Sequence, residues 1–172
     1  MVAPLLPLAP PPLPPGLLLE RLGPVQFAET IGELRGSPAS QRVAQAERLA
    51  LSPVPCQAWA LRRQEDGAIL ACGQTVAEAE LVGLYDVFTH PQARGQGLAR
   101  QLCTALLARA GVDDGARVAY LQVEADNHAA RAIYHRLGFS DVYAYHYRMP
   151  DADLTGRWGR LDSALSGISS LA

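Results

Sequence analysis

Apolar residues in the first half of the chain recur with two different periods. Short apolar or alternating runs that end at turn residues indicate strands, whereas apolar residues three or four positions apart indicate helices. On this basis strands are predicted at 17–22, 56–62, 68–77 and 81–89, and helices at 25–34 and 39–51. A polar turn closed by Asp66-Gly67 separates two of these strands, so an antiparallel hairpin that the strand at 81–89 extends is expected.

A glycine-rich turn marks a change of period in the second half of the chain. After Gly97, leucines recur every four residues, which predicts a helix that Gly111 stops. A strand at 118–123, a helix from Asp126 or Asn127 to Gly138, and an aromatic, strand-like run at 139–147 are predicted to follow. A meander followed by helix, strand, helix and strand predicts an α/β fold with a mixed central sheet and helices on its faces.

The two ends of the chain have a different character from its middle. Residues 1–15 are apolar, but their many prolines forbid the continuous helix of a signal peptide or membrane span. We predict an extended, proline-rich tail at 1–15, a folded domain at 16–150, and a weakly ordered tail at 151–172, where the periodicity is lost.

Composition and charge narrow the classes of partner. The 172 residues are 49% hydrophobic and 19% charged, an ordinary mixture for one globular domain. A net charge of −2 gives no overall positive field for nucleic acid or an anionic membrane, so neither partner is expected. The three cysteines are widely spaced, which favours free thiols and a cytoplasmic location. No pair of histidines has metal-ligand spacing, and no metal is expected.

The segment Arg94-Gly95-Gln96-Gly97-Leu98-Ala99 lies where strand gives way to helix. Small residues let the backbone approach a ligand closely, and the free amide groups of a helix's first turn suit an anion such as phosphate. A tight loop without a ligand also needs glycine, so this segment alone leaves both interpretations open. Dinucleotide-binding and P-loop turns do not fit, because the third glycine of the first and the Gly-Lys-Ser or Gly-Lys-Thr of the second are missing.

These residues resemble the pyrophosphate loop of the GNAT superfamily of acetyl-CoA-dependent N-acetyltransferases. That loop has Arg or Gln, two residues, Gly, one residue, then Gly or Ala, and Arg94, Gly97 and Ala99 fill these places. The stretch at 121–127, with Tyr134 and Gly138-Phe139 after it, resembles the family's other cofactor-binding stretch. The resemblance covers about 83–148. It implies a GNAT-like fold, whose mixed, mostly antiparallel sheet is splayed at the cofactor cleft and flanked by about four helices.

The resemblance also implies where acetyl-CoA would bind. Backbone groups of Phe88 and Thr89 would pair with the pantetheine arm as an extra strand would, and Asn127 would contact its distal amide. The complete set of implied cofactor contacts is Phe88, Thr89, Arg94, Gly95, Gln96, Gly97, Leu98, Ala99, Asn127, Ala130 and Tyr134.

Tyr134 is the first candidate for a catalytic role, and the resemblance implies a place near the thioester sulfur. A phenol can donate the proton that a departing thiolate needs. The alternative is that Tyr134 is simply a core aromatic residue beside Ala130 and Leu137.

The base that would deprotonate the acceptor amine is less clear from the sequence. In ribosomal-protein alanine acetyltransferases a strand glutamate is thought to do this, and the matching position is Gln122, which cannot accept a proton near neutral pH. Glu124 lies two residues on, and strand alternation would put it on the same face as Gln122. The candidates are, in order, Glu124, Asp86 and Glu80.

The predicted function is transfer of the acetyl group of acetyl-CoA to a primary amine by direct attack in a ternary complex. The acceptor, a small molecule or a protein, is not identified, and a homodimer is open because the family often dimerises. A non-catalytic acyl-CoA-binding regulatory or sensor module is the alternative, which Gln122 supports. A protein-interaction role for the proline-rich start is a third hypothesis.

Overall fold

The structure is a computed structural model that describes residues 1–6, 9–54 and 56–144. Residues 1–142 form one compact unit, and 143–172 belong to a second. All of the helices and strands in the described residues belong to the first unit. The predicted tail at 151–172 lies outside the described residues, as does the end, 145–147, of the strand-like run predicted at 139–147.

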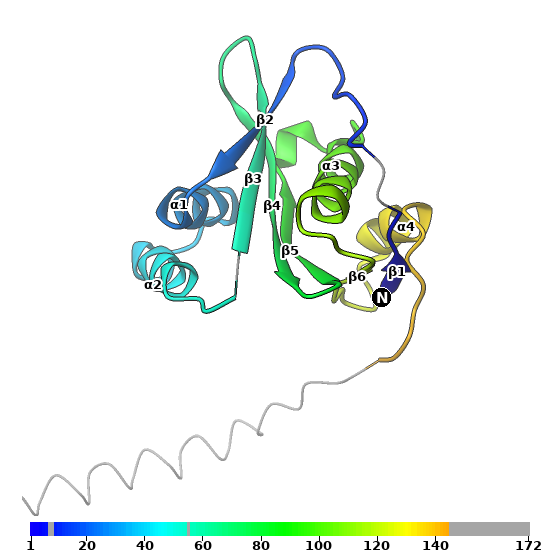
Figure 1. The fold of residues 1–172 in the computed structure, drawn as a ribbon. Coiled ribbons are helices and arrows are strands. Elements are labelled where there is room, and N and C mark those ends of the chain that lie inside the picture. The colour runs from blue at the N-terminus through cyan, green and yellow to red at the C-terminus, as the bar shows by residue number, and fades with distance from the viewer. Residues whose placement is uncertain (7–8, 55, 145–172) are drawn as a thin grey trace, which may run out of the picture. The chain divides into compact units, whose positions relative to one another are not determined.

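A six-stranded sheet forms the centre of the unit (Figure 1). Its strands lie in the order β1-β6-β5-β4-β3-β2, and every neighbouring pair is antiparallel except β5 and β6, which are parallel. The bounds are Val2–Pro4 for β1, Leu17–Leu22 for β2, Cys56–Arg63 for β3, Ile69–Glu78 for β4, Leu81–Thr89 for β5 and Val118–Tyr120 for β6. The prediction of a mixed, mostly antiparallel sheet is confirmed.

Four α-helices cover the two faces of this sheet (Figure 1). They are α1 at Pro24–Arg35, α2 at Ala39–Ala50, α3 at Leu98–Asp113 and α4 at His128–Arg136, and a short 3-10 helix, η1, spans Pro91–Ala93. Helices α1 and α2 lie on one face, and α3 and α4 on the other. The predicted number of helices and the mixed α/β class are confirmed within the described residues.

Two apolar layers hold the helices to the sheet. On one face, Leu102 and Leu106 of α3 are buried in the larger cluster, as the four-residue repeat predicted. On the other face, Phe27 and Ile31 of α1 pack into a smaller cluster that includes Cys72 of β4. Burial of this kind contributes roughly 1.5–3 kcal/mol for each large apolar side chain.

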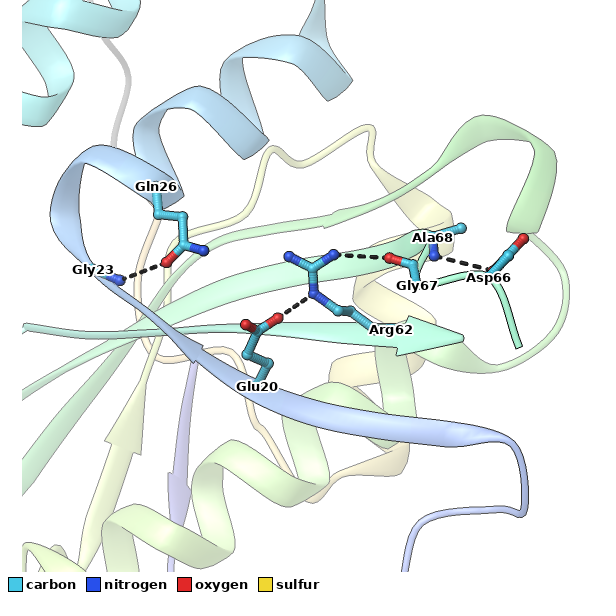
Figure 2. Close-up of polar contacts among 7 residues, drawn as sticks. All are labelled: Glu20, Gly23, Gln26, Arg62, Asp66, Gly67 and Ala68. Carbon is cyan, nitrogen blue, oxygen red and sulfur yellow. Dashed lines mark hydrogen bonds and ion pairs between the residues drawn. The ribbon is translucent and has the colours of Figure 1, made fainter. Parts of the chain in front are cut away.

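Polar contacts fix the outer edge of the sheet (Figure 2). Nε of Arg62 on β3 forms an ion pair with Glu20 of β2, and Nη1 of the same guanidinium donates to the Gly67 carbonyl at 2.8 Å. Asp66 accepts a hydrogen bond from the Ala68 amide at 3.1 Å, which closes the predicted turn between β3 and β4. At the start of α1, the Gln26 side chain accepts a bond from the Gly23 amide at 3.4 Å.

The start of the chain differs from the predicted extended tail. Val2–Pro4 is a paired strand, in register with β6, and Ala3 is only 1% exposed. Val2 also exchanges two backbone hydrogen bonds with Ser140, so β1 lies between β6 and that residue. The high proline content excludes a helix, but it does not exclude a short strand that ends at its first proline.

Strand β6 is shorter than the predicted 118–123. It ends at Tyr120, and the predicted strand at 139–147 is represented in the described residues by the single bridge at Ser140. A strand needs a partner along its whole length, and β5 accompanies β6 only as far as Tyr120.

The buried thiols predict a loss of stability at alkaline pH. Burial raises the pKa of Cys72 and of Cys103 from 9.0 to about 12. Because the folded pKa lies above the unfolded one, this contribution to stability is complete below pH 9.0 and is lost as the pH rises toward about 12. We expect the free energy of unfolding, measured in urea, to fall across this range.

A Cys103→Ala variant is the control for that measurement. It is less stable than the native chain at neutral pH, but the pH dependence of its unfolding free energy should be shallower. Equal slopes for the two proteins between pH 9.0 and about 12 would contradict the assignment of the effect to Cys103.

Candidate functional site

The sheet is splayed between β5 and β6, as predicted (Figure 1). The two strands pair only from Leu81 opposite Val118 to Gly83 opposite Tyr120. Beyond Gly83, β5 carries a bulge against β4, and Asp86 adopts a left-handed backbone with φ 51°. A bulge bends its strand and increases the local twist. The edge of β5 after Gly83 is therefore left without a partner strand in the described part of the chain.

Two tyrosines lie where β5 and β6 separate. The hydroxyls of Tyr85 and Tyr120 are 3.0 Å apart, and their rings meet edge to face at 6.1 Å between centroids. A Cβ added to Gly83 would lie 2.4 Å from the Tyr85 ring and 2.8 Å from that of Tyr120, so only glycine leaves room for the pair. Burial, with the bond to Tyr120 next, raises the pKa of Tyr85. Nothing in the sequence around Tyr85 and Tyr120 distinguishes this pair.

The glycine-rich loop leads from η1 into α3. Gly95 and Gly97 have φ of 78° and 75°, the left-handed region that L-residues rarely adopt. A Cβ at either position would meet nothing within 4 Å, so the backbone and not crowding requires glycine. Gly97 precedes the first turn of α3, and the first helical bond runs from the Gln101 amide to the Gly97 carbonyl. The amides of the residues between them thus have no partner within the helix.

Arg94 and the end of β5 lie together. The Arg94 side chain donates to the Thr89 carbonyl at 3.4 Å, and its guanidinium carbon is 5.6 Å from the centre of the Phe88 ring. Arg35 of α1 lies 5.8 Å from the same ring. The structure therefore brings the predicted strand-end residues and the predicted loop residue into one region.

The other residues of the glycine-rich loop differ in how far their side chains are exposed. Gln96 is exposed, and Ala99 is partly buried. Leu98 is 4% exposed and belongs to the core, so only its backbone amide is available to a ligand.

The second predicted stretch surrounds the start of α4. The Asn127 side-chain oxygen accepts a hydrogen bond from the Ala130 amide at 3.1 Å, which confirms the predicted cap. The amide nitrogen of this side chain has no partner within the described ranges. Tyr134, two turns into α4, packs its ring edge-on against Phe139, with 5.9 Å between centroids. Burial, and to a lesser degree Cys103, raises the pKa of Tyr134 well above its usual range.

The candidate bases occupy different surroundings. Asp86 at the bulge forms an ion pair with Arg35 at 2.9 Å and accepts a hydrogen bond from the Gln74 side chain at 2.9 Å. Glu124 is exposed beyond β6. Because β6 ends at Tyr120, the strand alternation that was expected to place Glu124 on the face of Gln122 does not apply. Glu80 precedes β5, at the opposite end of that strand from the bulge.

A comparison of the sequence with models of protein families identifies the family of this chain. Residues 28–139, more than half of the chain, match the model of the acetyltransferase (GNAT) family. The chain belongs to the GNAT family. It is therefore an acyltransferase, and the GNAT resemblance found in the sequence is confirmed. No curated protein sequence matches the chain.

Solved structures share the fold of this GNAT domain. AAC(6')-Iy, in complex with the bisubstrate analogue CoA-S-monomethyl-acetylneamine, is 18% identical with a TM-score of 0.62, over 78% of this chain and 98% of that one. A ribosomal-protein-alanine N-acetyltransferase from Brucella melitensis biovar Abortus 2308 is 18% identical with a TM-score of 0.60, over 77% and 99%. A GCN5-related N-acetyltransferase from Kribbella flavida is 24% identical with a TM-score of 0.55, over 81% of this chain and 52% of that chain.

Some features of this GNAT domain escape sequence analysis. Arg35 and Gln74 contact Asp86 from α1 and β4, although they are far from it in sequence. Gln74 could have been noticed as a polar residue inside an otherwise apolar strand, but nothing in the sequence distinguishes Arg35. In the described part of the chain, no acidic, histidine and cysteine side chains gather in a group fit for a metal ion. No described helix is long and apolar enough to cross a bilayer.

Proposed function

We propose that this GNAT domain transfers the acetyl group of acetyl-CoA to a primary amine by direct attack in a ternary complex. One observation carries the proposal: the left-handed glycine loop at the start of α3 lies beside a sheet edge that the β5 bulge opens. Free helix-end amides suit a diphosphate, and an open strand edge suits an extended chain of amides. Acetyl-CoA has both of these groups and supplies the acetyl thioester.

The cofactor contacts follow from these positions. Arg94, Gln96 and the backbone at 97–99 would hold the pyrophosphate, each helix-end interaction contributing roughly 0.3–1 kcal/mol. Backbone groups of Phe88 and Thr89 would bind the pantetheine arm, and the unpartnered amide nitrogen of Asn127 would bind its distal amide.

Proton transfers would fall to side chains on either side of the split. Tyr134 would donate its phenolic proton to the departing sulfur, because a phenol, whose pKa burial raises further here, is protonated at neutral pH. Asp86 or Glu124, acting through water, would remove a proton from the acceptor ammonium. Asp86 differs from Glu124 in lying at the bulge itself, where the sheet edge opens.

Calorimetry of the full chain with acetyl-CoA tests this proposal, with NADH and free CoA as comparisons. We expect micromolar binding of both CoA species and none of NADH, followed by release of free thiol when an amine acceptor is added. Binding without thiol release for any amine would favour the non-catalytic, acyl-CoA-sensing alternative. A folded protein that does not bind acetyl-CoA would contradict the proposal.

A further inference from the structure

A pocket of about 200 Å³ is lined by residues of α2, of the sheet and of the segment between them. Helix α2 lies on the face of the sheet opposite α3 (Figure 1). Helix α2 contributes Gln45, Arg48 and Leu49 to its wall. Strands β3, β4 and β5 contribute Cys56, Gln74 and Asp86. Because Asp86 belongs to the bulge that opens the edge of β5, the pocket reaches the same point of the sheet as the proposed cofactor site.

Gln74, which lines this pocket, has an unused hydrogen-bond acceptor. Its side chain is 7% exposed, and its nitrogen Nε2 donates to Oδ2 of Asp86 at 2.9 Å. A carboxylate can only accept, so Nε2 must face Asp86 and the amide oxygen Oε1 must point elsewhere. Among the described residues, Oε1 is buried without any donor. Such an atom favours a bound molecule that brings an N–H group to it.

The charges around the pocket do not suit a polycation. Asp86 is the acidic residue of the described lining, and its carboxylate already forms an ion pair with Arg35. Arg48 lines the pocket and forms no ion pair within the described chain. The Cys56 thiol stays protonated, because burial raises its pKa despite a hydrogen bond from Ser52. With Arg35 included, positive groups therefore outnumber negative ones.

We propose that this pocket binds the acceptor and selects amines that also carry a carboxylate, as amino acids do. The inference rests on the proposed function. Oε1 of Gln74 accepts an N–H of the amine, and Arg48 binds the carboxylate, for which a planar guanidinium offers two parallel hydrogen bonds. Polyamines and aminoglycosides would bring further positive charge to Arg48. The fold shared with AAC(6')-Iy thus does not extend to the charge of the acceptor.

Matched pairs of amines that differ only in the carboxylate test this selection. Lysine is compared with 1,5-diaminopentane, and tyrosine with tyramine, by calorimetry on the full chain saturated with CoA. We expect the carboxylate-bearing member of each pair to bind about tenfold more tightly, the effect of one well-formed charge-assisted contact. Equal binding within the pairs, or tighter binding of the diamine, would overturn the proposal.

Substitutions of Arg48 and of Gln74 test whether these residues bind the acceptor. Arg48→Gln on the exposed surface of α2 should abolish the difference within each pair, whereas Arg21→Gln, an exposed arginine on β2, should preserve it. Gln74→Leu should weaken both members of a pair equally and leave CoA affinity unchanged. A melting curve shows whether Gln74→Leu folds, and Arg48→Gln decides the question if it does not. If Arg48→Gln still binds the carboxylate-bearing amine of each pair more tightly, the inference is refuted.

Failure of the two proposals can be told apart. The amine titrations are therefore repeated without CoA. Amino-acid selectivity in a chain that does not bind CoA would refute the proposed function but support the assignment of the pocket. Binding of CoA without amino-acid selectivity would refute the pocket assignment and support the cofactor site.

Discussion

Replacing Gly97 by valine should weaken binding of acetyl-CoA at least tenfold. Gly97 has φ 75°, where a residue with a side chain costs roughly 1–2 kcal/mol, and a β-branched residue is particularly unfavourable. The loop would relieve this strain by rotating the peptide groups that aim amides at the proposed pyrophosphate site. Calorimetry with acetyl-CoA measures the loss directly.

Gly115→Val is the matched control for this experiment. Gly115 lies just beyond the other end of α3 with φ 71°, and a Cβ there would also meet nothing within 4 Å. The two variants should therefore lose similar stability, and only Gly97→Val should lose affinity. Equal affinities of the two variants for acetyl-CoA would show that the glycine loop is not part of the cofactor site.

Replacing Tyr134 by phenylalanine should lower kcat by about 10²–10⁴-fold, the usual contribution of a positioned proton donor, and leave acetyl-CoA affinity nearly unchanged. Phenylalanine keeps the ring that packs against Phe139, so little stability is lost. Burial raises the pKa of Tyr134, and the phenol is thus protonated below its ordinary pKa of about 10 and for some distance above it. The ratio of the two kcat values should be constant from about pH 6 to 9.

Tyr85→Phe provides the comparison, because it also removes a partly buried hydroxyl near the split. Its bond to Tyr120 would be lost, and we expect a much smaller fall in kcat. Similar losses in the two variants would show that the Tyr134 hydroxyl has no special role. If Tyr134→Phe has the same kcat as the native protein, Tyr134 is only a core aromatic residue.

Local patterns predicted the elements of this fold well. The strand at Leu17–Leu22 has the predicted bounds, and Asn127 caps α4 as expected, because turn and cap residues act over only a few positions. The left-handed glycines before α3 lie where the loop pattern placed them. These features depend on residues that are close in sequence, so they can be predicted from one sequence alone.

Contacts between distant segments could not be predicted in the same way. The sequence around Asp86 does not indicate that Arg35 and Gln74 contact it, because these partners belong to other elements. The strand at Val2–Pro4 was missed for the same reason, because its partner β6 lies near the other end of the described chain. Tertiary pairing, not local preference, determines these features.

The pairing of β1 has a consequence for the order in which the protein folds. The hydrogen bond from the Met1 nitrogen to the Leu121 carbonyl joins positions 120 residues apart. Closing so large a loop costs entropy before any contact is gained, so such pairings slow folding. During synthesis β1 must wait, unpaired, until β6 has left the ribosome. Ser140, which exchanges backbone hydrogen bonds with Val2, is synthesised later still, so this edge of the sheet is completed after the rest.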